Sequence, residues 1–328
     1  YYDEKTDEAY LFFGGGRKDG VAADNPGTGR VVKLGKDMIS LDGDPVKMET
    51  PYLFEDSSVI KIGDTWYYSY CANWNVPSGT SINGSSFGSA DICYMTSKNP
   101  LGPWGKDQFA GMVFGNTGSQ RIDNGGNNHH SIMYFKGEYY VAYHSRNYSN
   151  RVGITFTDKS NGSKSSDGNY RSTQINKATF NASNGTITCN GDMTGCEQIE
   201  YLNPYVTNRA ATMANQSGIA ISGVGDTVVT DINKGDWIKL KGVDFSDGCQ
   251  TITVKASSQS GAVIKVSKGG PTGTAFAYVE VPAGSSNKEI TVACKSISGV
   301  NDITFEFSGD MSFFLPVSQD YAVFVDET

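Results

Sequence analysis

Glu55 is the residue whose surroundings in the sequence most suggest proton-transfer chemistry. It follows the apolar run 51–54, Pro-Tyr-Leu-Phe, and precedes a predicted β-hairpin at residues 59–70. A carboxyl group between Phe54 and a buried hairpin should lose solvation, and this raises its pKa toward the value that a general acid needs near neutral pH. A charged residue at the end of a loop would have the same spacing, and spacing alone favours that simpler interpretation.

The hairpin is predicted by the residue types on either side of a tight turn. β-branched and aromatic residues occupy 59–62 and 65–70, with Gly63-Asp64 between them. Residues 131–143 repeat the order of apolar strand, glycine-containing turn and aromatic strand. Strand-forming segments recur at roughly 60–75 residues, which is typical of β-propeller blades. We therefore predict three sheet units, in residues 1–48, 49–118 and 119–195, with 38–41 as the last strand of the first unit.

The composition agrees with an all-β protein. The chain of 328 residues has 39 glycines, 18 tyrosines and 16 phenylalanines, and only 19% of its residues are charged. No long segment shows the 3.6-residue apolar period of a helix, and no apolar run is long enough to span a membrane. The net charge is −8 and no basic stripe is present, which argues against a nucleic-acid partner. A neutral polysaccharide suits these features better.

The cysteines and glycosylation motifs favour a secreted protein. The six cysteines form no CxxC pair, which argues against zinc, and they fall two by two along the chain. This order suggests disulfides 71–93, 189–196 and 249–294, one of many possible pairings. Asn-x-Ser/Thr motifs begin at Asn83, Asn147, Asn161, Asn181, Asn184 and Asn215. A chain rich in asparagine and serine also produces such motifs by chance.

Several motifs in a fixed order extend this interpretation. They are Phe54-Glu55-Asp56-Ser57, residues 68–74, Asn127-Asn128-His129-His130-Ser131, Tyr143-His144 and Tyr170-Arg171-Ser172. Together they resemble glycoside hydrolase family 43, most of all its arabinoxylan arabinofuranohydrolase branch, over residues 1–205. The resemblance implies a five-bladed β-propeller, of which this chain covers about three blades. It also implies an inverting mechanism in which acid and base lie about 6.5–9.5 Å apart, with room for a water.

The resemblance assigns roles to individual side chains. Glu55 matches the general acid, which reverses the balance drawn from spacing alone. Arg171 matches an arginine that binds substrate hydroxyls and orients the acid, with Arg146 as the alternative; each equally suits a surface position. Trp74 would stack on a sugar face, although it equally suits a hydrophobic lid. The remaining residues expected to bind substrate are Asn73 and Asn128.

The resemblance also implies a cation at the propeller axis, commonly calcium reached by a histidine through water. His129 is the better match and His130 the second choice. Calcium prefers six to eight oxygen ligands, so waters would have to complete the shell. A histidine hydrogen-bonded in the floor of the funnel fits the motif equally well, and His144, at a strand end, is more typical of a structural residue.

Two carboxylates of the family pattern have no match here. The family places its base in the first blade and the aspartate that tunes the acid just before the strand that matches 9–13. The acidic residues in that region are more typical of a charged turn before a strand than of these two carboxylates. They are Asp3, Glu4, Asp7 and Glu8. We therefore expect the base and the tuning aspartate on an N-terminal segment of the same protein, about two blades long, which packs against this chain and closes its open sheet edges.

Residues 207–328, after a linker at 201–206, are predicted to form a β-sandwich of jelly-roll type. They resemble a family 6 carbohydrate-binding module at 235–238, 243–245 and 270–273. Arg209 and Ala211 stand where that family has two calcium-binding glutamates, so that site is in doubt. The loop 228–230 and Ala322 lack the rings that usually hold a sugar by stacking. We expect weak sugar binding or a structural role for this domain.

The sequence thus predicts a secreted hydrolase that removes α-L-arabinofuranosyl side chains from arabinoxylan. A β-xylosidase or an arabinanase of the same family is the alternative specificity. A non-catalytic carbohydrate-binding protein is the alternative from a different class.

Overall fold

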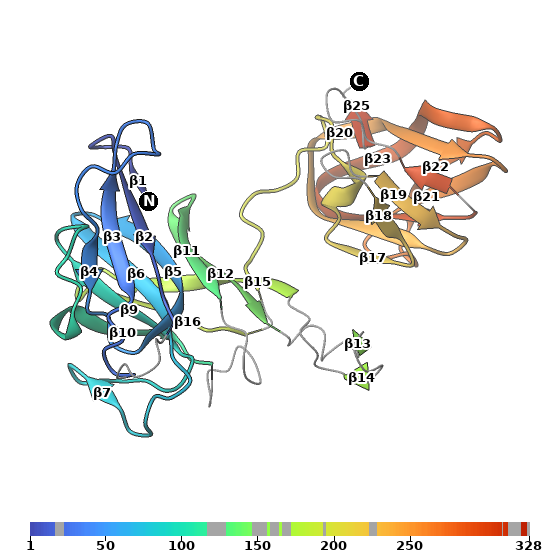
Figure 1. The fold of residues 1–328 in the computed structure, drawn as a ribbon. Helices are drawn as coiled ribbons and strands as arrows, with labels where there is room; N and C mark the ends of the chain where they lie inside the picture. The colour runs from blue at the N-terminus through green and yellow to red at the C-terminus, as the bar shows by residue number, and fades with distance from the viewer. Residues whose placement is uncertain are drawn as a thin grey trace. The chain divides into compact units, whose positions relative to one another are not determined.

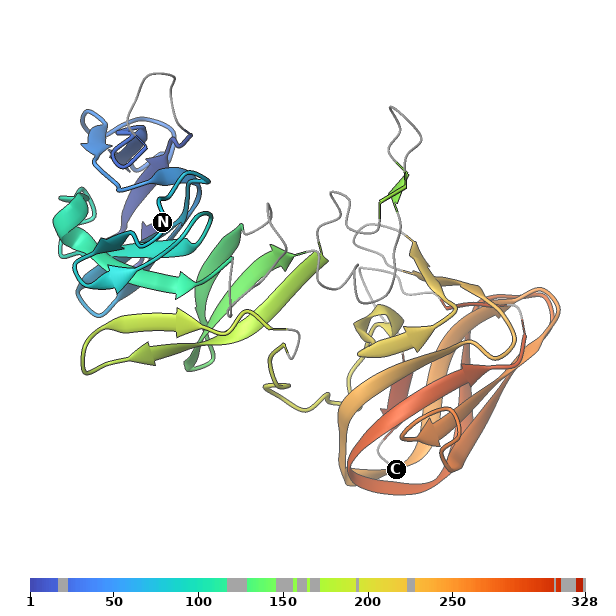
Figure 2. The same cartoon turned by 90° about the horizontal axis from the view of Figure 1, so that it is seen from below.

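The computed structural model describes residues 1–16, 23–116, 129–145, 156–157, 164–165, 172–192, 195–222, 228–309, 311–313 and 323–326. The chain divides into two compact units, Tyr1–Glu197 and Gln198–Thr328. Strands dominate both units, as Figure 1 and Figure 2 show, so the predicted all-β class is confirmed. In the described part of the chain, no helix has the length and apolarity needed to cross a membrane.

Each of the three segments predicted as repeats forms one four-stranded sheet. The first sheet has the order β1 (Tyr2–Asp3), β2 (Glu8–Phe13), β3 (Gly29–Leu34), β4 (Val46–Met48). The second has the order β10 (Phe109–Phe114), β9 (Ile92–Ser97), β6 (Thr65–Ala72), β5 (Leu53–Ile62). The third has the order β11 (His130–Phe135), β12 (Glu138–Ser145), β15 (Ser172–Asn181), β16 (Thr186–Cys189). Two short pairs complete the unit, β7 (Ser81–Ile82) with β8 (Ser85–Ser86) and β13 (Phe156–Thr157) with β14 (Lys164–Ser165), beside the 3-10 turn η1 (Lys106–Gln108).

The last strand of the first sheet was predicted wrongly. It is Val46–Met48 rather than residues 38–41. Asp37 explains the difference, because its Oδ1 accepts hydrogen bonds from the backbone N–H of Ile39 and from both the backbone N–H and the hydroxyl of Ser40. These bonds close a turn, in which Met38 has φ +61°, and a turn competes with an extended strand.

The central hairpin matches the prediction at its turn and differs at its start. Ile62 pairs with Thr65 across Gly63-Asp64, as a two-residue hairpin turn requires. However, β5 begins at Leu53, so Glu55 lies within a strand and not at the tip of a loop. The pairing of β5 with β6 is irregular on both sides of Glu55.

Strand β6 separates two cores, which is why it reads as an unbroken apolar and aromatic run. Trp66, Tyr68 and Tyr70 pack in a core with residues of the first sheet. Tyr67 and Cys71, which point the other way, pack in a core with residues of the third sheet. A strand buried on both faces is expected to lack the alternation of a half-exposed strand.

The sheet register also tests the proposed disulfides. Cys93 pairs with Tyr70, so Cys71 and Cys93 belong to opposite faces and to different cores. The predicted 71–93 pairing is therefore wrong. The thiol of Cys189 is buried and directed at the carbonyl of Lys177, whereas Cys196 is exposed, so the 189–196 pairing gains no support.

The second unit is one hydrogen-bonded sheet of nine strands around a single apolar core. It is dominated by β20 (Trp237–Ser258) and β23 (Ser285–Phe307), which pair along their lengths with four shifts of register. The other strands are β17 (Asn215–Ser217), β18 (Ala220–Ser222), β19 (Val228–Ile232), β21 (Ala262–Lys268), β22 (Ala275–Val281), β24 (Met311–Phe313) and β25 (Val323–Asp326), with the 3-10 turn η3 (Ala210–Thr212).

The predicted linker 201–206 belongs to this second unit. The N–H of Leu202 donates to Gly242 O at 2.8 Å, and Leu202 O accepts from the N–H of Asp244 at 2.9 Å. The side chain of Leu202 packs on the core. These contacts make the segment part of the second unit, although its sequence looks polar and irregular.

Candidate functional site

Glu55 lies where β5 changes its pairing with β6. It is opposite Cys71, with a shift of register before it and another after it. Such bulges redirect a side chain out of the regular alternation and are common beside active sites. The Glu55 side chain is 45% exposed, so the burial expected from the sequence is absent in this chain. A polymeric substrate can therefore reach the carboxyl group.

His129 holds one of the two carboxyl oxygens of Glu55. Its Nε2 lies 2.9 Å from Glu55 Oε1, within hydrogen-bond distance. The ring of His129 packs against that of His144, with centroids 5.1 Å apart, and His129 O accepts a hydrogen bond from His144 N–H. The contact is made through Oε1, and the side chain as a whole remains 45% exposed. The structure thus gives His129 a contact with the predicted acid rather than with a group of metal ligands.

The glycine run after β2 supports the backbone behind Glu55. The N–H of Gly16 donates a hydrogen bond to Phe54 O. Gly15 has φ +146°, and a Cβ added there would lie 2.7 Å from Phe54 O and 3.6 Å from the Cα of Glu55. Only glycine lets the two backbones approach this closely. The first sheet therefore helps to place the strand that carries Glu55.

We expect Gly15→Ala to destabilise the first unit, because the added methyl group must push the backbone away at Phe54 and Glu55. The free energy of unfolding should fall by about 1–3 kcal/mol, as for other substitutions that overpack a close contact. Urea denaturation followed by circular dichroism measures this loss. Gly79→Ala is the matched control, because Gly79 also has positive φ but has open space around its Cβ position. Equal losses in the two variants would show that backbone strain, and not contact with β5, is responsible.

His130 has a hydrogen-bonding partner at each ring nitrogen, so its prediction as a metal ligand gains no support. Nδ1 bonds Asp56 Oδ2, and Nε2 lies 2.7 Å from Ser69 Oγ. No role for Asp56 or Ser69 is predicted from the sequence. A signal was present, since two adjacent acidic residues, Glu55-Asp56, face two adjacent histidines, His129-His130, on neighbouring strands.

The described residues do not fit a calcium site. No group of three or more His, Cys, Asp or Glu side chains that could hold a metal occurs in the part of the chain that the structure describes. Among the described residues, Glu55 is the carboxylate within ion-pair distance of His129. Calcium needs six to eight oxygens, and one carboxylate supplies at most two of them.

Asn73 and Trp74 have different surroundings. Asn73 is buried; its Oδ1 accepts the N–H of Asn75 at 2.7 Å and its Nδ2 donates to Ala23 O at 3.4 Å. Its amide therefore organises a loop, and the prediction that it binds substrate is not supported. Trp74 is partly exposed, as a stacking platform has to be. The other predicted substrate residues lie outside the described residues; they are Asn128, Arg146 and Arg171.

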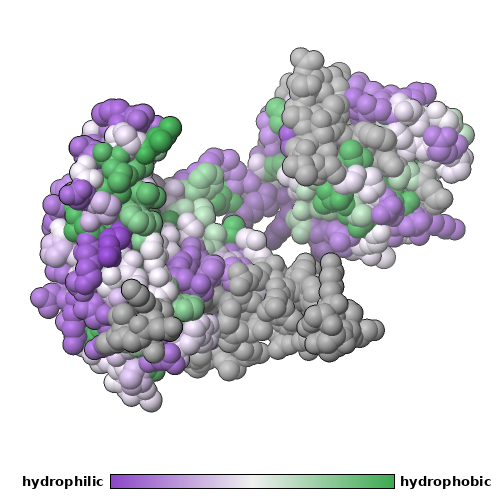
Figure 3. All heavy atoms as spheres, in the orientation of Figure 1, coloured by the Kyte–Doolittle hydropathy of each residue, from purple (hydrophilic) through white to green (hydrophobic). Residues whose placement is uncertain are grey.

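Apolar side chains remain exposed on the outer sheets of the first unit. Leu11 and Phe13 project from β2, and Met133 and Phe135 from β11. Figure 3 shows apolar atoms gathered over the first sheet. Exposed apolar groups that cluster on a sheet face usually mark a surface that packs against another segment.

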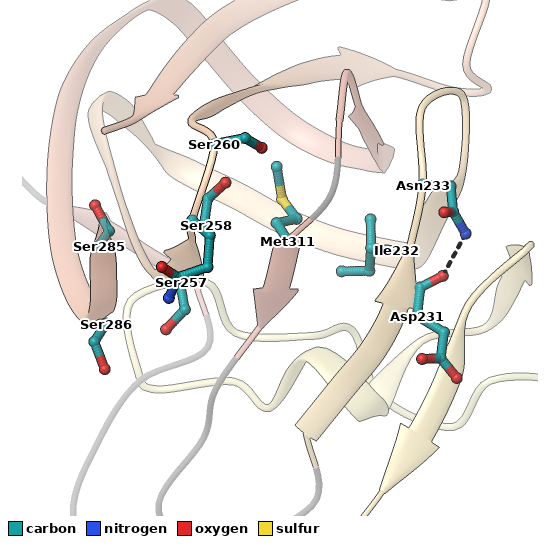
Figure 4. A pocket seen from close by; sticks show the side chains of 10 residues that line it. Asp231, Ile232, Asn233, Ser257, Ser258, Ser260, Ser285, Ser286 and Met311 are labelled. Atoms are coloured by element: carbon teal, nitrogen blue, oxygen red, sulfur yellow. Dashed lines mark hydrogen bonds between the residues drawn. The ribbon is translucent and has the colours of Figure 1, made fainter. Parts of the chain in front are cut away.

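The second unit carries its own polar cleft, with a volume of about 620 Å³. Figure 4 shows Asp231 and Asn233 on one side, a group of serines on the other, and the apolar side chains of Ile232 and Met311 between them. Several of these polar groups are already bonded within the protein: Asn233 Nδ2 donates to Asp231 O at 2.8 Å, and Ser257 Oγ accepts the N–H of Asn287 at 2.6 Å. Among the described lining residues there is no aromatic ring to stack on a sugar.

Comparisons with known proteins cover both units. The chain is 34% identical over 319 residues to an arabinoxylan arabinofuranohydrolase of Paenibacillus polymyxa and 33% identical over 317 residues to one of Bacillus subtilis (strain 168). Each match covers 92% of this chain, which spans 47% and 58% of the lengths of these two relatives.

A solved structure gives the same result. The chain matches a glycoside hydrolase family 43 arabinoxylan arabinofuranohydrolase from Bacillus subtilis, in complex with cellotetraose, with a TM-score of 0.79 and 31% identity. That match covers 96% of this chain and 65% of the other. Residues 209–324 match the model for carbohydrate-binding modules of family 6. This chain is therefore a relative, over nearly its whole length, of the family 43 arabinoxylan arabinofuranohydrolases, and its second unit is similar to carbohydrate-binding modules of family 6.

Proposed function

We infer that this chain is part of a secreted, inverting glycoside hydrolase that removes α-L-arabinofuranosyl side chains from arabinoxylan. The observation that supports this most is Glu55, which is half exposed and held through one oxygen by His129, in a chain related over 92% of its length to arabinoxylan arabinofuranohydrolases. Glu55 acts as general acid. The base and the aspartate that tunes the acid lie on an N-terminal segment.

The reaction needs one proton at the leaving oxygen and one water at the anomeric carbon. Glu55 donates its proton from Oε2 to the glycosidic oxygen as that bond breaks. The base takes a proton from a water that attacks the anomeric carbon from the opposite face, and arabinose leaves with inverted configuration. His129 keeps Oε1 in place during the transfer, so the carboxyl group does not have to be oriented at the moment of reaction.

The N-terminal segment has a place to pack. We assign to it the exposed apolar faces formed by Leu11 and Phe13 on β2 and by Met133 and Phe135 on β11. Covering both faces would close the three sheets into a five-bladed propeller. It would also desolvate the surroundings of Glu55, which the sequence predicts for a general acid.

The second unit acts as a carbohydrate-binding module of low affinity, with a β-sandwich architecture. Hydroxyl and amide groups line its cleft, but stacking on aromatic rings, worth about 0.5–1.5 kcal/mol per ring, is missing from the described lining. We expect retardation of the whole chain on a xylan affinity gel to be slight, and Asp231→Ala to leave it within about twofold. Strong retardation that Asp231→Ala abolishes would contradict this expectation.

Secretion places the thiols of Cys249 and Cys294 in an oxidising environment. Their Sγ atoms lie 3.3 Å apart on the paired strands β20 and β23. We expect a disulfide to form there, with loss of two hydrogen atoms to an oxidant such as glutathione disulfide, and to raise the free energy of unfolding by about 2–4 kcal/mol. Thermal unfolding with and without reductant measures this, and Cys294→Ala, which cannot form the bond, is the control. Full thiol labelling of the oxidised protein would contradict the prediction.

Calcium at the propeller axis stays a prediction. His129 is the remaining candidate among the two histidines proposed, and waters or other residues would have to provide the oxygens. Metal analysis of the purified protein, before and after chelation, tests it.

Identification of the purified material decides between the enzyme and its alternatives. Intact mass and N-terminal sequencing show whether an additional N-terminal segment is present, and incubation with wheat arabinoxylan shows whether arabinose is released. Release of arabinose by the protein with that segment supports the proposal. Release of xylose or of arabinan fragments instead would assign a β-xylosidase or an arabinanase, and binding without release would assign a carbohydrate-binding protein.

A further inference from the structure

A second acid–imidazole pair lies directly beside the contact between Glu55 and His129. Asp56 follows Glu55 on β5, and His130 follows His129 and begins β11. The first pair is partly exposed. The second is turned inward, because the His130 side chain is 0% exposed and that of Asp56 is 12% exposed. The two pairs therefore lie next to each other along the chain, one partly exposed and one in the interior.

The inward pair continues into a chain of hydrogen bonds. Asp56 Oδ2 accepts from the backbone N–H of His130 at 2.7 Å and also bonds its Nδ1. His130 Nε2 lies 2.7 Å from Ser69 Oγ, which lies 3.2 Å from Ser58 O. Ser58 Oγ in turn accepts the N–H of Ile132 at 3.0 Å. This relay links β5, β6 and β11, and it satisfies polar groups that would be costly to bury unpaired.

The backbone at Asp56 is held in a conformation that needs such support. Asp56 has φ +59°, the left-handed region, and the pairing of β5 with β6 is irregular on both sides of Glu55. A non-glycine residue in this region is strained, and the conformation persists only when its surroundings hold it there. The bonds from His130 to Asp56 are the described contacts that do so. The position of the Glu55 backbone therefore depends on the relay.

The relay itself is not a site of chemistry. Aspartate, histidine and serine in this order resemble a nucleophilic triad. Ser69 is only 1% exposed and His130 is fully buried, so no substrate can reach the Ser69 hydroxyl. The group must act through its neighbours.

We propose that Asp56, His130 and Ser69 are positioning residues, which fix Glu55 and His129 in the geometry that proton transfer to the leaving oxygen requires. This inference rests on the proposed role of Glu55 as general acid. It adds that a buried relay between strands positions the acid. Damage to the relay should therefore reduce the protonation of the leaving oxygen by Glu55 and leave substrate binding unchanged.

The dependence of rate on the leaving group tests the inference. In the protein that carries its N-terminal segment, Asp56→Asn and Ser69→Ala should lower kcat on arabinoxylan about 10–100-fold, with KM changed less than about twofold, because the acid is displaced while substrate contacts remain. On a dinitrophenyl arabinofuranoside, whose leaving group needs no proton, both variants should approach the wild-type rate. Asp64→Asn, in the exposed turn of the same hairpin, is the matched control and should behave as the wild type on both substrates.

A double-variant cycle separates positioning from general damage. In a Glu55→Gln background, Ser69→Ala should lower kcat on arabinoxylan by less than a further factor of about two, because the acid that Ser69 positions is already lost. Full additivity, or equal losses of rate on the two substrates, would overturn the inference while leaving the role of Glu55 intact.

Imidazole NMR gives a readout that needs no activity. The protein has three histidines, and the relay predicts one of them to have an Nδ1 proton protected from exchange, which Asp56→Asn removes. Glu55→Gln made in the wild-type protein should shift the His129 Nε2 resonance. The same substitution made in the Asp56→Asn variant should leave this resonance unmoved, because the contact between Glu55 and His129 is already lost there. If no arabinose is released but these shifts are seen, the proposed function fails and the relay stands. If the Glu55→Gln shift survives Asp56→Asn, the relay fails.

Discussion

Glu55→Gln is expected to lower arabinose release from arabinoxylan by about 10²–10⁴-fold, measured in the protein that carries its N-terminal segment. Glutamine keeps the size of the side chain and its contact with His129, but it has no acidic proton to give to the leaving oxygen. The loss should fall on kcat, because the arabinose contacts are unchanged. It should nearly vanish on a dinitrophenyl arabinofuranoside, whose leaving group departs unprotonated.

Glu138 provides a close control for this substitution. Its side chain is 49% exposed and Lys177 Nζ lies 2.8 Å from its carboxylate, so Glu138, like Glu55, is a half-exposed glutamate with a basic partner. Glu138→Gln should leave the rate unchanged. A Glu55→Gln protein with the wild-type rate on arabinoxylan would remove Glu55 as the acid and favour the non-catalytic interpretation.

Trp66→Ala is expected to lower the free energy of unfolding of the first unit by about 3–5 kcal/mol. Trp66 is 3% exposed, and its ring contacts Tyr1 and Tyr10 at centroid distances of 4.9 and 5.3 Å. The Lys61 ammonium lies 5.1 Å from the centre of the same ring. Removal of the indole therefore opens a cavity between the first and second sheets. Urea denaturation followed by circular dichroism measures the loss.

The control for Trp66 comes from Trp74, which is 39% exposed. Trp74→Ala should cost less than about 1 kcal/mol, because little packed surface is lost. If Trp74 stacks on the substrate, its substitution should raise KM while unfolding stays the same. Similar stabilities of the Trp66→Ala and wild-type proteins would show that the two sheets do not depend on this contact.

The bond between Lys61 and Asp3 supports the same junction of β5 with β1. Lys61 Nζ lies 2.5 Å from Asp3 Oδ2, and this hydrogen bond lowers the pKa of the buried Asp3 carboxyl below its usual value. Because the pKa of Asp3 is lower in the folded state than in the unfolded state, its ionised carboxyl group stabilises the fold at every pH above the unfolded-state pKa. This stabilisation is lost as the pH falls through the folded-state pKa. The first sheet should therefore loosen in acid.

Residues close together in the sequence were sufficient to predict the structure where contacts between near neighbours determine it. Gly63-Asp64 between two runs of strand formers predicted the β5–β6 hairpin, and its register is the one that a two-residue turn requires. The recurrence of such hairpins predicted the three sheet units. The ordered motifs around Glu55 and His129 pointed to the relatives that the comparisons found, because those motifs combine residue identity with spacing.

Local sequence failed where a partner strand decides. The register of β6 with β9 separated Cys71 from Cys93 although they are near in sequence. The exposure of Glu55 also differed from expectation, since it depends on what covers β5. None of these outcomes can be read from neighbours along the chain.

The all-β class, the repeated hairpins, a carbohydrate-binding-module-like domain at residues 207–328 and the candidate acid were all predictable from the residues along the chain. How the acid is held depends on the folded sheets. The tertiary structure brought Glu55-Asp56 and His129-His130, 74 residues apart, into contact through adjacent strands, and directed one histidine to the acid and the other to a buried relay. The physical reason is that hydrogen bonds between distant strands depend on register and burial, which arise only when the sheets pack together.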